Sequence, residues 1–195
     1  MRDKLTIGMP VYEDVRVETL ISLLHTLFDL GKDYAVEVDI QTSAYLHENR
    51  NKICAKAIAD GSKWLLFIDA DMLWSPHSIR ALIANDKAII GVNYNTRRPP
   101  TVSTLKFMGD DGCLVQGNVD LKPEPMRCFA CGAGFLLLKV DSLKKIPQPW
   151  FDFGRWADGG VLGEDIFFCK KAAEHGFDVW FDPRVRVGHV GTQIY

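Results

Sequence analysis

The sequence predicts an α/β domain with a mostly parallel central sheet. Strand-like and helix-like segments alternate up to residue 68, which is the order of a β-α-β-α-β unit. The segment Trp64–Ile68 is apolar without interruption, as in a strand that is buried on both faces. With 195 residues and 47% hydrophobic content, the chain has the size of a single domain with one core.

Apolar patterning places the elements of the first half. Strands are expected at Leu5–Pro10, Val36–Ile40, Trp64–Ile68 and Ala88–Val92. Helices lie between them, and Gly31 and Asp60-Gly61 end the first two. The apolar positions at helical spacing are Leu20, Leu23, Leu24, Leu27 and Phe28, then Ile53, Ala57 and Ile58 in a helix from about Glu48 to Ala59, then Ile79, Leu82 and Ile83.

The second half has a different pattern, with short strand-like runs separated by turns rich in glycine and proline. We expect these runs, near Val102–Phe107, Cys113–Val115 and Phe135–Val140, to form an antiparallel or mixed part of the same sheet. A helix that opens at Glu164 and ends at Gly176 precedes a last strand at Val179–Phe181. No linker or repeat separates the halves, so one domain over residues 1–195 is predicted.

Asp69 and Asp71 follow the apolar strand directly. Side chains two residues apart in extended chain share a face, so both carboxylates are expected to point past the carboxyl end of the strand, where open α/β sheets bind ligands. Hard oxygen donors there suit Mg²⁺ or Mn²⁺. Aspartates are also common in ordinary turns, and Ser75-Pro76 is typical of a helix start, so this pair alone is a weak signal.

Composition and charge exclude several classes of protein. A net charge of −2 and a pI near 6.2 argue against binding to nucleic acid or an anionic membrane through bulk charge. No segment has the length of a signal peptide core or of a membrane helix, which needs about 20 apolar residues. Five cysteines, an odd number, favour free thiols, and we expect a soluble cytoplasmic protein in which Cys128 and Cys131 pack as small apolar residues.

Two further segments allow both a functional and a structural interpretation. Trp150, Phe151 and Phe153 lie in a loop with several glycines and either stack on a sugar or fill the core. Glu164 and Asp165 open a helix, where they act as first-turn acids or as a proton acceptor. The helix N-terminus is expected to lower their pKa values and keep them ionised.

Six motifs follow one another along the chain: Thr6–Tyr12, Asn49–Asn51, Asp69–Asp71, Gly132–Gly134, Gly163–Asp165 and Val187–Val190. Together they resemble the GT-A fold glycosyltransferases, specifically the family 2-like group that uses nucleotide-diphosphate sugars. The resemblance covers nearly the whole chain and implies a three-layer, Rossmann-like sandwich with a mostly parallel sheet and a smaller antiparallel part. It implies a nucleotide-sugar-binding half at about 1–95 and an acceptor and catalytic half at about 96–195.

The resemblance also implies roles for the residues of the donor site. Asp71 and His189 would ligate Mn²⁺ or Mg²⁺, with Asp69 on the ribose or on a metal-bound water. Ala70 lies between the two aspartates of this DxD motif. Pro10, Tyr12 and Glu13 would line the nucleoside pocket, and Arg50 would reach the base or the diphosphate.

On the acceptor side, the resemblance implies that Asp165 takes the proton of the acceptor hydroxyl. Glu164 would bind hydroxyls of the acceptor or of the donor sugar, and Gly132, Gly134, Trp150 and Trp156 would contact acceptor or sugar. Uridine diphosphate is the favoured nucleotide, with guanosine and deoxythymidine diphosphate as open alternatives. The acceptor stays open: a glycan, a small molecule, a protein and a modified nucleic acid are all compatible with the resemblance. Basic groups could indicate a phosphate-bearing acceptor, but such scattered groups are typical of solvated surface. They are Arg97-Arg98, Lys144-Lys145 and Arg184 with Arg186.

Three alternatives remain beside an inverting transferase. The stretch Arg186–Val190 is also similar to the histidine segment of retaining polypeptide GalNAc-transferases, although the Glu164-Asp165 pair favours inversion. A catalytically silent nucleotide-sugar binding module is the second alternative. A nucleotidyltransferase is less favoured, because no glycine-rich basic loop follows the first strand. Many family members continue past the metal histidine into a lid or acceptor module, so the six residues after His189 fit either a minimal enzyme or part of a longer one.

Overall fold

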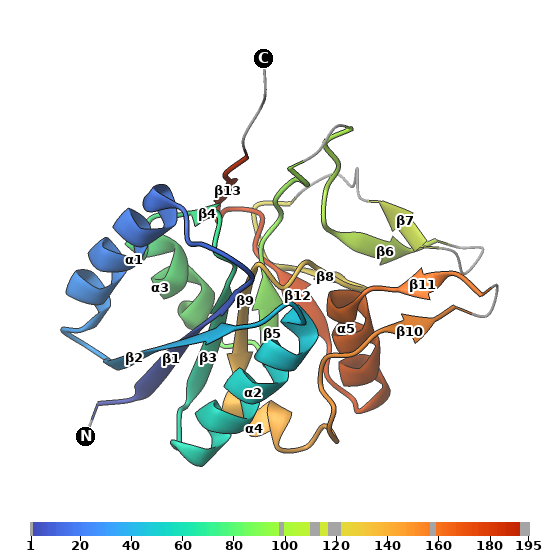
Figure 1. Cartoon of the computed structure of the whole chain (residues 1–195). Coiled ribbons are helices and arrows are strands. Elements are labelled where there is room, and N and C mark those ends of the chain that lie inside the picture. The colour runs from blue at the N-terminus through green and yellow to red at the C-terminus, as the bar shows by residue number, and fades with distance from the viewer. Residues whose placement is uncertain (1, 98–99, 110–113, 117–121, 157–158, 192–195) are drawn as a thin grey trace.

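A seven-stranded sheet lies at the centre of the fold (Figure 1). The computed structural model describes residues 2–97, 100–109, 114–116, 122–156 and 159–191. The strand order is β2-β1-β3-β9-β5-β12-β8, and all strands except β9 and β8 run in one direction. The strands are β1 (Lys4–Val11), β2 (Ala35–Thr42), β3 (Trp64–Ile68), β5 (Ile89–Gly91), β8 (Met126–Cys128), β9 (Phe135–Lys139) and β12 (Val179–Phe181). The predicted mixed α/β architecture with a mostly parallel sheet is therefore confirmed.

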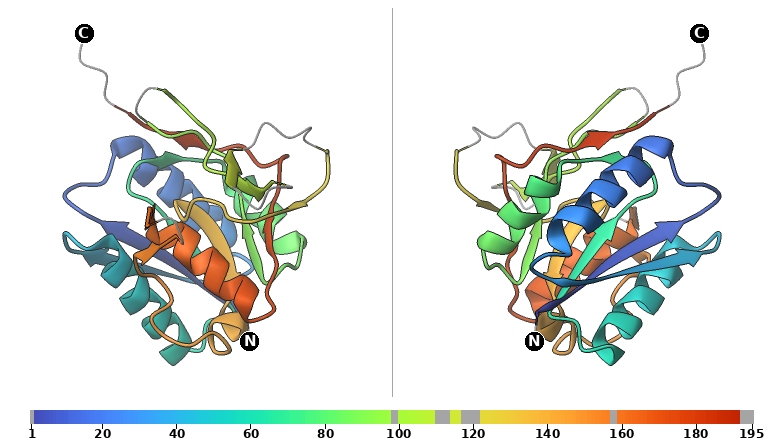
Figure 2. Two further views of the ribbon diagram at one scale, coloured as in Figure 1. Left: turned by 90° about the vertical axis from the view of Figure 1, so that its right-hand side faces the viewer. Right: turned by 90° about the vertical axis from the view of Figure 1, so that its left-hand side faces the viewer.

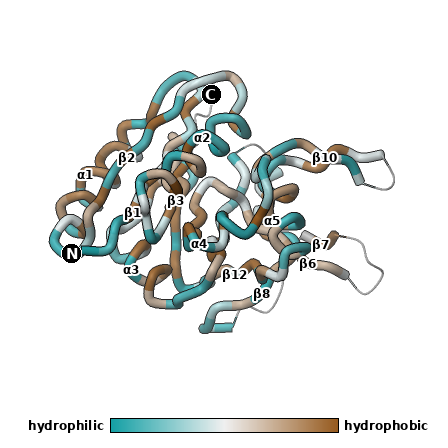
Figure 3. The backbone as a smooth tube through the Cα atoms, turned by 90° about the horizontal axis from the view of Figure 1, so that it is seen from below, coloured by the Kyte–Doolittle hydropathy of each residue, from teal (hydrophilic) through white to brown (hydrophobic). Residues whose placement is uncertain are grey.

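Helices cover both faces of the sheet (Figure 2). One face packs against α1 (Val17–Leu30) and α3 (Pro76–Ala84). The other packs against α2 (Leu46–Ala59), α4 (Val140–Leu143) and α5 (Glu164–Glu174). All five residues of β3 are buried between these layers, and the tube in Figure 3 is hydrophobic along this strand.

Three two-stranded ribbons lie outside the main sheet. They are β4 (Met72–Leu73) with β13 (Gly188–His189), β6 (Lys106–Met108) with β7 (Leu114–Gln116), and β10 (Gly154–Arg155) with β11 (Val161–Leu162). The expectation that the runs near 102–107 and 113–115 join the central sheet is wrong, because β6 and β7 pair with each other instead. Cys113 and Arg98 lie outside the described residues.

Helix α1 turns a partly polar face to the core. The hydroxyl of Thr26 accepts the indole N–H of Trp74 at 2.8 Å, and the hydroxyl of Thr19 donates to the carbonyl of Met72 at 2.8 Å. These bonds satisfy polar groups that would otherwise be buried without a partner, so the hydroxyl-bearing face is the one that packs. Several of the apolar residues at helical spacing consequently face solvent: Leu20, Leu24 and Phe28 are 42%, 64% and 79% exposed.

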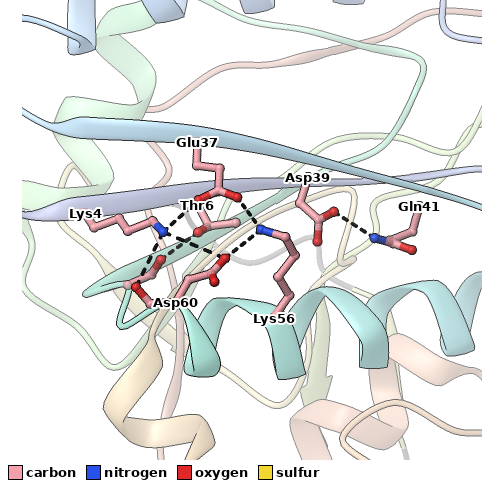
Figure 4. A network of polar contacts seen from close by, with 8 residues as sticks. Lys4, Thr6, Glu37, Asp39, Gln41, Lys56 and Asp60 are labelled. Atoms are coloured by element: carbon pink, nitrogen blue, oxygen red, sulfur yellow. Dashed lines mark hydrogen bonds and ion pairs between the residues drawn. The ribbon is translucent and has the colours of Figure 1, made fainter.

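Charged contacts fasten α2 to the edge of the sheet (Figure 4). Lys56 of α2 pairs with Glu37 of β2 and, at 2.6 Å, with Asp60. Lys4 of β1 reaches the same Glu37 at 2.7 Å. These contacts help to fix the helix that carries Arg50.

The described cysteines are free thiols, as predicted. Cys54, Cys131 and Cys169 are buried, and Cys128 is half-buried on β8. Cys131 is only 1% exposed and belongs to the core, which confirms that it packs as a small apolar residue. Within the described ranges, no helix is both long enough and apolar enough to cross a membrane.

Candidate functional site

The site lies where β3 ends and β9 begins. Because β9 runs antiparallel to β3, with Ile68 opposite Phe135, the segment that enters β9 lies beside the residues that leave β3. The amide of Asp69 donates to the carbonyl of Gly134 at 3.0 Å. The sheet thereby brings the aspartate motif and the glycine motif together, although they lie 65 positions apart in the sequence (69 to 134).

A cavity of about 380 Å³ opens at this edge of the sheet. Its volume is within the range of small-molecule sites. The structure brings seven of the predicted donor-site residues to its wall. They are Pro10, Tyr12, Glu13, Asp69, Ala70, Asp71 and His189.

Asp71 and His189 are in direct contact on the wall of this cavity. Strand β13 pairs with β4, so that His189 lies opposite Met72, and the amide of Val190 donates to the carbonyl of Asp71 at 2.7 Å. His189 Nε2 is 3.3 Å from Asp71 Oδ1. The ribbon therefore holds His189 against Asp71, and their predicted role as metal ligands stays a prediction.

Each of these two groups affects the other's protonation. Burial opposes the charged imidazolium of His189, but its hydrogen bonds to Asp71 and to the carbonyl of Asn95 prevail and raise its pKa. Burial likewise opposes the Asp71 carboxylate, while the hydrogen bond from His189 and the charge of Arg97 lower its pKa below the ordinary value. Asp71 is thus held as an anion.

The donor chemistry of this pair fits a divalent cation. His189 Nδ1 donates to the carbonyl of Asn95 at 2.9 Å, which orients Nε2 towards Asp71 as in the supported histidines of metal sites. The described residues contain no group of three or more His, Cys, Asp or Glu side chains that could hold a metal. Mg²⁺ binds in proteins through one or two carboxylates plus substrate phosphates. The pair therefore supplies one carboxylate and one imidazole, and a cation bound there would need further ligands from water or from a bound substrate.

Asp69 lines the same cavity as Asp71 and pairs with Arg50. Arg50 Nη2 donates to Asp69 Oδ1 at 2.9 Å, and the arginine is 2% exposed. Burial raises the pKa of Asp69 against the opposing charge of Arg50. Arg50 is not among the residues that line the cavity, and it pairs with Asp69 from the buried side. The contact with a base or diphosphate that the resemblance implies for Arg50 stays a prediction.

Arg50 also connects the donor side to the acidic pair of α5. Its Nη2 is 3.8 Å from Glu164 Oε1, and its guanidinium lies over the rings of Phe67 and Phe151. Its Nε and Nη1 have no hydrogen-bond partner in the described part of the chain. The buried guanidinium of Arg50 thus lies close to one carboxylate that follows β3, Asp69, and to one at the start of α5, Glu164.

Asp165 has an elevated pKa. Burial, with the adjacent Glu164 charge adding to it, raises the pKa of Asp165 to about 6. Its Oδ1 accepts the N–H of Ile166 at 2.7 Å, a bond that opposes this shift. The predicted lowering is therefore wrong for Asp165, because burial and the charge of Glu164 outweigh the hydrogen bond from Ile166. A carboxylate with this pKa is ionised at pH 7 and is basic enough to accept a proton.

The glycine motif leaves room for Tyr94. A Cβ on Gly134 would lie 2.6 Å from the Tyr94 hydroxyl and 2.8 Å from Asp69 Oδ2. Instead, the amide of Gly134 donates to the Tyr94 hydroxyl at 2.9 Å. A side chain on Gly132 would also meet Tyr94. The two glycines are buried behind Asp69 and not on the cavity wall, so their predicted contact with acceptor or sugar is not seen at this cavity.

Of the two tryptophans predicted to contact a sugar or acceptor, Trp150 lies in the core and Trp156 is half-buried. Trp150 is 3% exposed, and its indole N–H donates to the carbonyls of Leu143 and Ile146 at 3.0 Å. The prediction that it stacks on a sugar is wrong, since both of its faces and its polar group are used in the core. Trp156 is half-buried after β10, where its ring lies 6.3 Å from that of Phe129, and its contact with a sugar stays a prediction.

The cavity also contains residues that the sequence did not identify. Asp14, Arg16, Leu46 and Arg97 line it beside the predicted set. Arg97 Nη1 is 2.5 Å from Asp71 Oδ2. Arg97 follows β5 in sequence, and the rule that ligands bind past the carboxyl ends of parallel strands is the signal that would have indicated it.

Known proteins share this fold but not a close sequence. No family model and no curated protein matches the chain. The crystal structure of A197 from STIV matches with a TM-score of 0.63 and 17% identity, over 97% of this chain and 86% of A197. The structure of the inositol-1-phosphate CTP transferase from T. maritima matches with a TM-score of 0.49 and 11% identity, over 97% of this chain and 89% of that one. The likeness to A197 shows a shared fold, and the function must be argued from the site itself.

Proposed function

We propose that the protein is a divalent-cation-dependent glycosyltransferase that moves a sugar from a nucleoside-diphosphate sugar to an acceptor hydroxyl. The observation that carries this proposal is the meeting of Asp71 and His189 on the wall of a cavity that also contains Pro10, Tyr12 and Glu13. A cation-binding pair and a nucleoside-sized space at the carboxyl edge of the sheet are what a diphosphate donor requires.

The donor would lie along the cavity wall. The residues after β1 are exposed there, with Tyr12 60% exposed, and they are free to pack against a base and ribose. Uridine diphosphate is the favoured nucleotide from the family resemblance. Asp71 and His189 would hold Mn²⁺ or Mg²⁺, which supplies Lewis-acid neutralisation of charge on the leaving diphosphate.

Asp165 would accept the proton of the acceptor hydroxyl. Its pKa of about 6 leaves it ionised at neutral pH, and its place at the start of α5 connects it through Arg50 to Asp69. Direct attack of the hydroxyl on the anomeric carbon, opposite the leaving diphosphate, gives inversion. Glu164, whose Oε1 is 3.8 Å from Arg50 Nη2, would accept hydrogen bonds from hydroxyls of the acceptor or of the donor sugar.

Calorimetric titration tests the donor site without knowledge of the acceptor. Nucleoside diphosphates and their sugars are titrated into the protein with Mn²⁺ and again with a chelator. Binding of one diphosphate sugar that requires Mn²⁺ and is lost in Asp71→Ala and His189→Ala supports the proposal. A folded protein that binds none of them with Mn²⁺ contradicts it.

Slow hydrolysis of the bound donor tests the chemistry, because water replaces the acceptor hydroxyl. We expect Asp165→Asn to lower diphosphate release by about 10²-fold or more while donor binding persists. Unchanged release would instead favour a silent binding module or a different base. The anomeric configuration of the released sugar, read by NMR before mutarotation, distinguishes inversion from retention.

A further inference from the structure

Arg97 already provides a cation at the position where a metal would be bound. Its guanidinium is 2.5 Å from Asp71 Oδ2, and its side chain is 49% exposed while that of Asp71 is 13% exposed. The arginine therefore reaches from the open side of the cavity onto a carboxylate in the wall. An ion pair of this kind is short but partly solvated, so it is stable enough to form and weak enough to exchange.

The other oxygen of Asp71 is also in use. His189 Nε2 lies 3.3 Å from Oδ1, and the same loop that carries Arg97 holds His189 Nδ1 through the carbonyl of Asn95. Both oxygens of one carboxylate thus face nitrogen atoms of the chain. A divalent cation bound by Asp71 and His189 would have to compete with the guanidinium for this carboxylate.

We propose that Arg97 is a donor-site residue that exchanges between two anions. Without ligand it neutralises Asp71, and when a divalent cation occupies Asp71 it turns to the diphosphate of the donor. This inference rests on the proposed nucleotide-diphosphate function of the cavity. It names Arg97 as a determinant of both cation and donor binding.

The chemistry of arginine supports the second position. A guanidinium presents parallel N–H donors that match phosphate oxygens, and it keeps its charge at any physiological pH. Arg97 lines the same cavity as Pro10, Tyr12 and Asp71, so its half-exposed head faces the space proposed for the donor. Release from Asp71 needs only rotation of the side chain.

The exchange predicts effects of opposite sign when Arg97 is removed. Arg97→Ala frees Asp71 from a competing cation, so we expect Mn²⁺ alone to bind about three- to fivefold more tightly. The same variant lacks a charged contact to the diphosphate, so UDP at saturating Mn²⁺ should bind about tenfold more weakly. Mn²⁺ affinity is measured from the EPR signal of the free ion, and UDP affinity by calorimetry.

Three further variants separate a specific exchange from general charge. Arg16→Ala removes one positive charge from the same cavity without removing a contact to Asp71, and it should leave the Mn²⁺ affinity nearly unchanged. Arg97→Lys keeps the charge and should retain most of the competition. Asp71→Asn should abolish Mn²⁺ binding both in the wild type and in Arg97→Ala. This loss would show that the ion measured is the one at this site.

The proposal stands only if both effects of Arg97→Ala appear. It is overturned if Mn²⁺ binds no more tightly than in Arg16→Ala, if UDP affinity is unchanged, or if no variant binds Mn²⁺ through Asp71. None of these measurements involves sugar transfer. A protein that shows the exchange but never transfers a sugar would contradict the proposed function and leave the role of Arg97 intact.

Discussion

Arg50 is the residue on which the two acidic parts of the site depend. It is buried, and its charge acts on Asp69, Glu164 and Asp165. We expect Arg50→Ala to lower the free energy of unfolding by about 3 kcal/mol, since it leaves a partly buried carboxylate without its partner. The figure is at the low end for buried pairs because the Asp69 side chain keeps 28% exposure. Urea denaturation measures it.

Arg50→Lys is the matched control. It keeps the charge near Asp69 but not the planar group that lies over Phe67 and Phe151. We expect a smaller loss of stability than in the alanine variant. Equal losses in the two variants would mean that packing of the guanidinium, and not its charge, is what Arg50 contributes.

In the proposed transfer reaction, the protonation of Asp165 would set the pH dependence. A base must be unprotonated, and a group with a pKa of about 6 becomes protonated as the pH falls through that value. We therefore expect kcat/KM for transfer to fall about tenfold per pH unit below about pH 6 and to level off above it. A pH–rate profile with saturating cation measures this acidic limb, the part of the profile in which kcat/KM falls as the pH is lowered.

Glu164→Gln tests the cause of that limb. The charge of Glu164 contributes to the raised pKa of Asp165, so its removal should move the limb to lower pH whatever happens to the maximal rate. A limb that stays in place would assign the ionisation to another group.

At the residue scale, the sequence predicts the positions of side chains that directly follow a strand. It predicts less well the positions of side chains that reach the site, or the core, from elsewhere in the fold. Asp69, Asp71 and Tyr12 all line the cavity, because the carboxyl ends of neighbouring parallel strands meet at one edge. Trp150 was misplaced because an aromatic residue beside glycines has the same local pattern in a lid and in a core. Arg97 was judged to be solvated surface, and only the tertiary structure shows that it reaches Asp71.

At the scale of elements, α1 offers a direct test of which face carries the packing. Leu23 is 7% exposed and its neighbour Leu24 is 64% exposed, so two adjacent leucines have different environments in one helix. We expect Leu23→Ala to cost about 2–3 kcal/mol and Leu24→Ala less than about 0.5 kcal/mol. Thermal or urea denaturation of the two variants, each against the wild type, measures the difference.

Comparable losses in both variants would contradict the orientation of this helix. The orientation could not be read from apolar periodicity, because Leu20, Leu24 and Phe28 recur as regularly as buried positions do. What decides it is a pair of hydroxyls, those of Thr26 and Thr19, that bond to the indole of Trp74 and to the carbonyl of Met72 on β4. Those partners lie about 50 residues away in sequence, beyond the reach of a local pattern (separations of 48 and 53 residues).

Strand existence was predicted more reliably than strand pairing. The runs at β1, β2, β3, β5, β9 and β12 were all expected as strands, and the pattern of each is apolar or alternating. The pairing of β6 with β7 away from the sheet was not expected, since a short run of residues contains no information on which edge it joins.

For the whole molecule, a ligand that binds the folded state should raise its thermal stability. At about 100 times its dissociation constant, a ligand adds about 2.7 kcal/mol. For a domain of this size that corresponds to an increase in Tm of about 5–10 °C. We expect this shift with UDP and Mn²⁺ together. Either one alone should give a much smaller shift, because the cation then lacks its diphosphate ligands or the diphosphate lacks its cation.

Asp71→Ala should lose the combined shift while its own Tm without ligand changes little. A thermal melt followed by circular dichroism gives both values. The same increase in wild type and Asp71→Ala would place the ligand elsewhere and contradict the site.

The position of β9 has a consequence for how the protein is made. This strand comes from residues 135–139 yet lies between β3 and β5, which are complete by residue 91. A nascent chain that has reached residue 134 therefore has two central strand edges with no neighbour between them. Such edges are sites for wrong pairing and aggregation. Closure of the sheet must wait for this distant segment, and pairing between segments that lie far apart in the sequence slows folding.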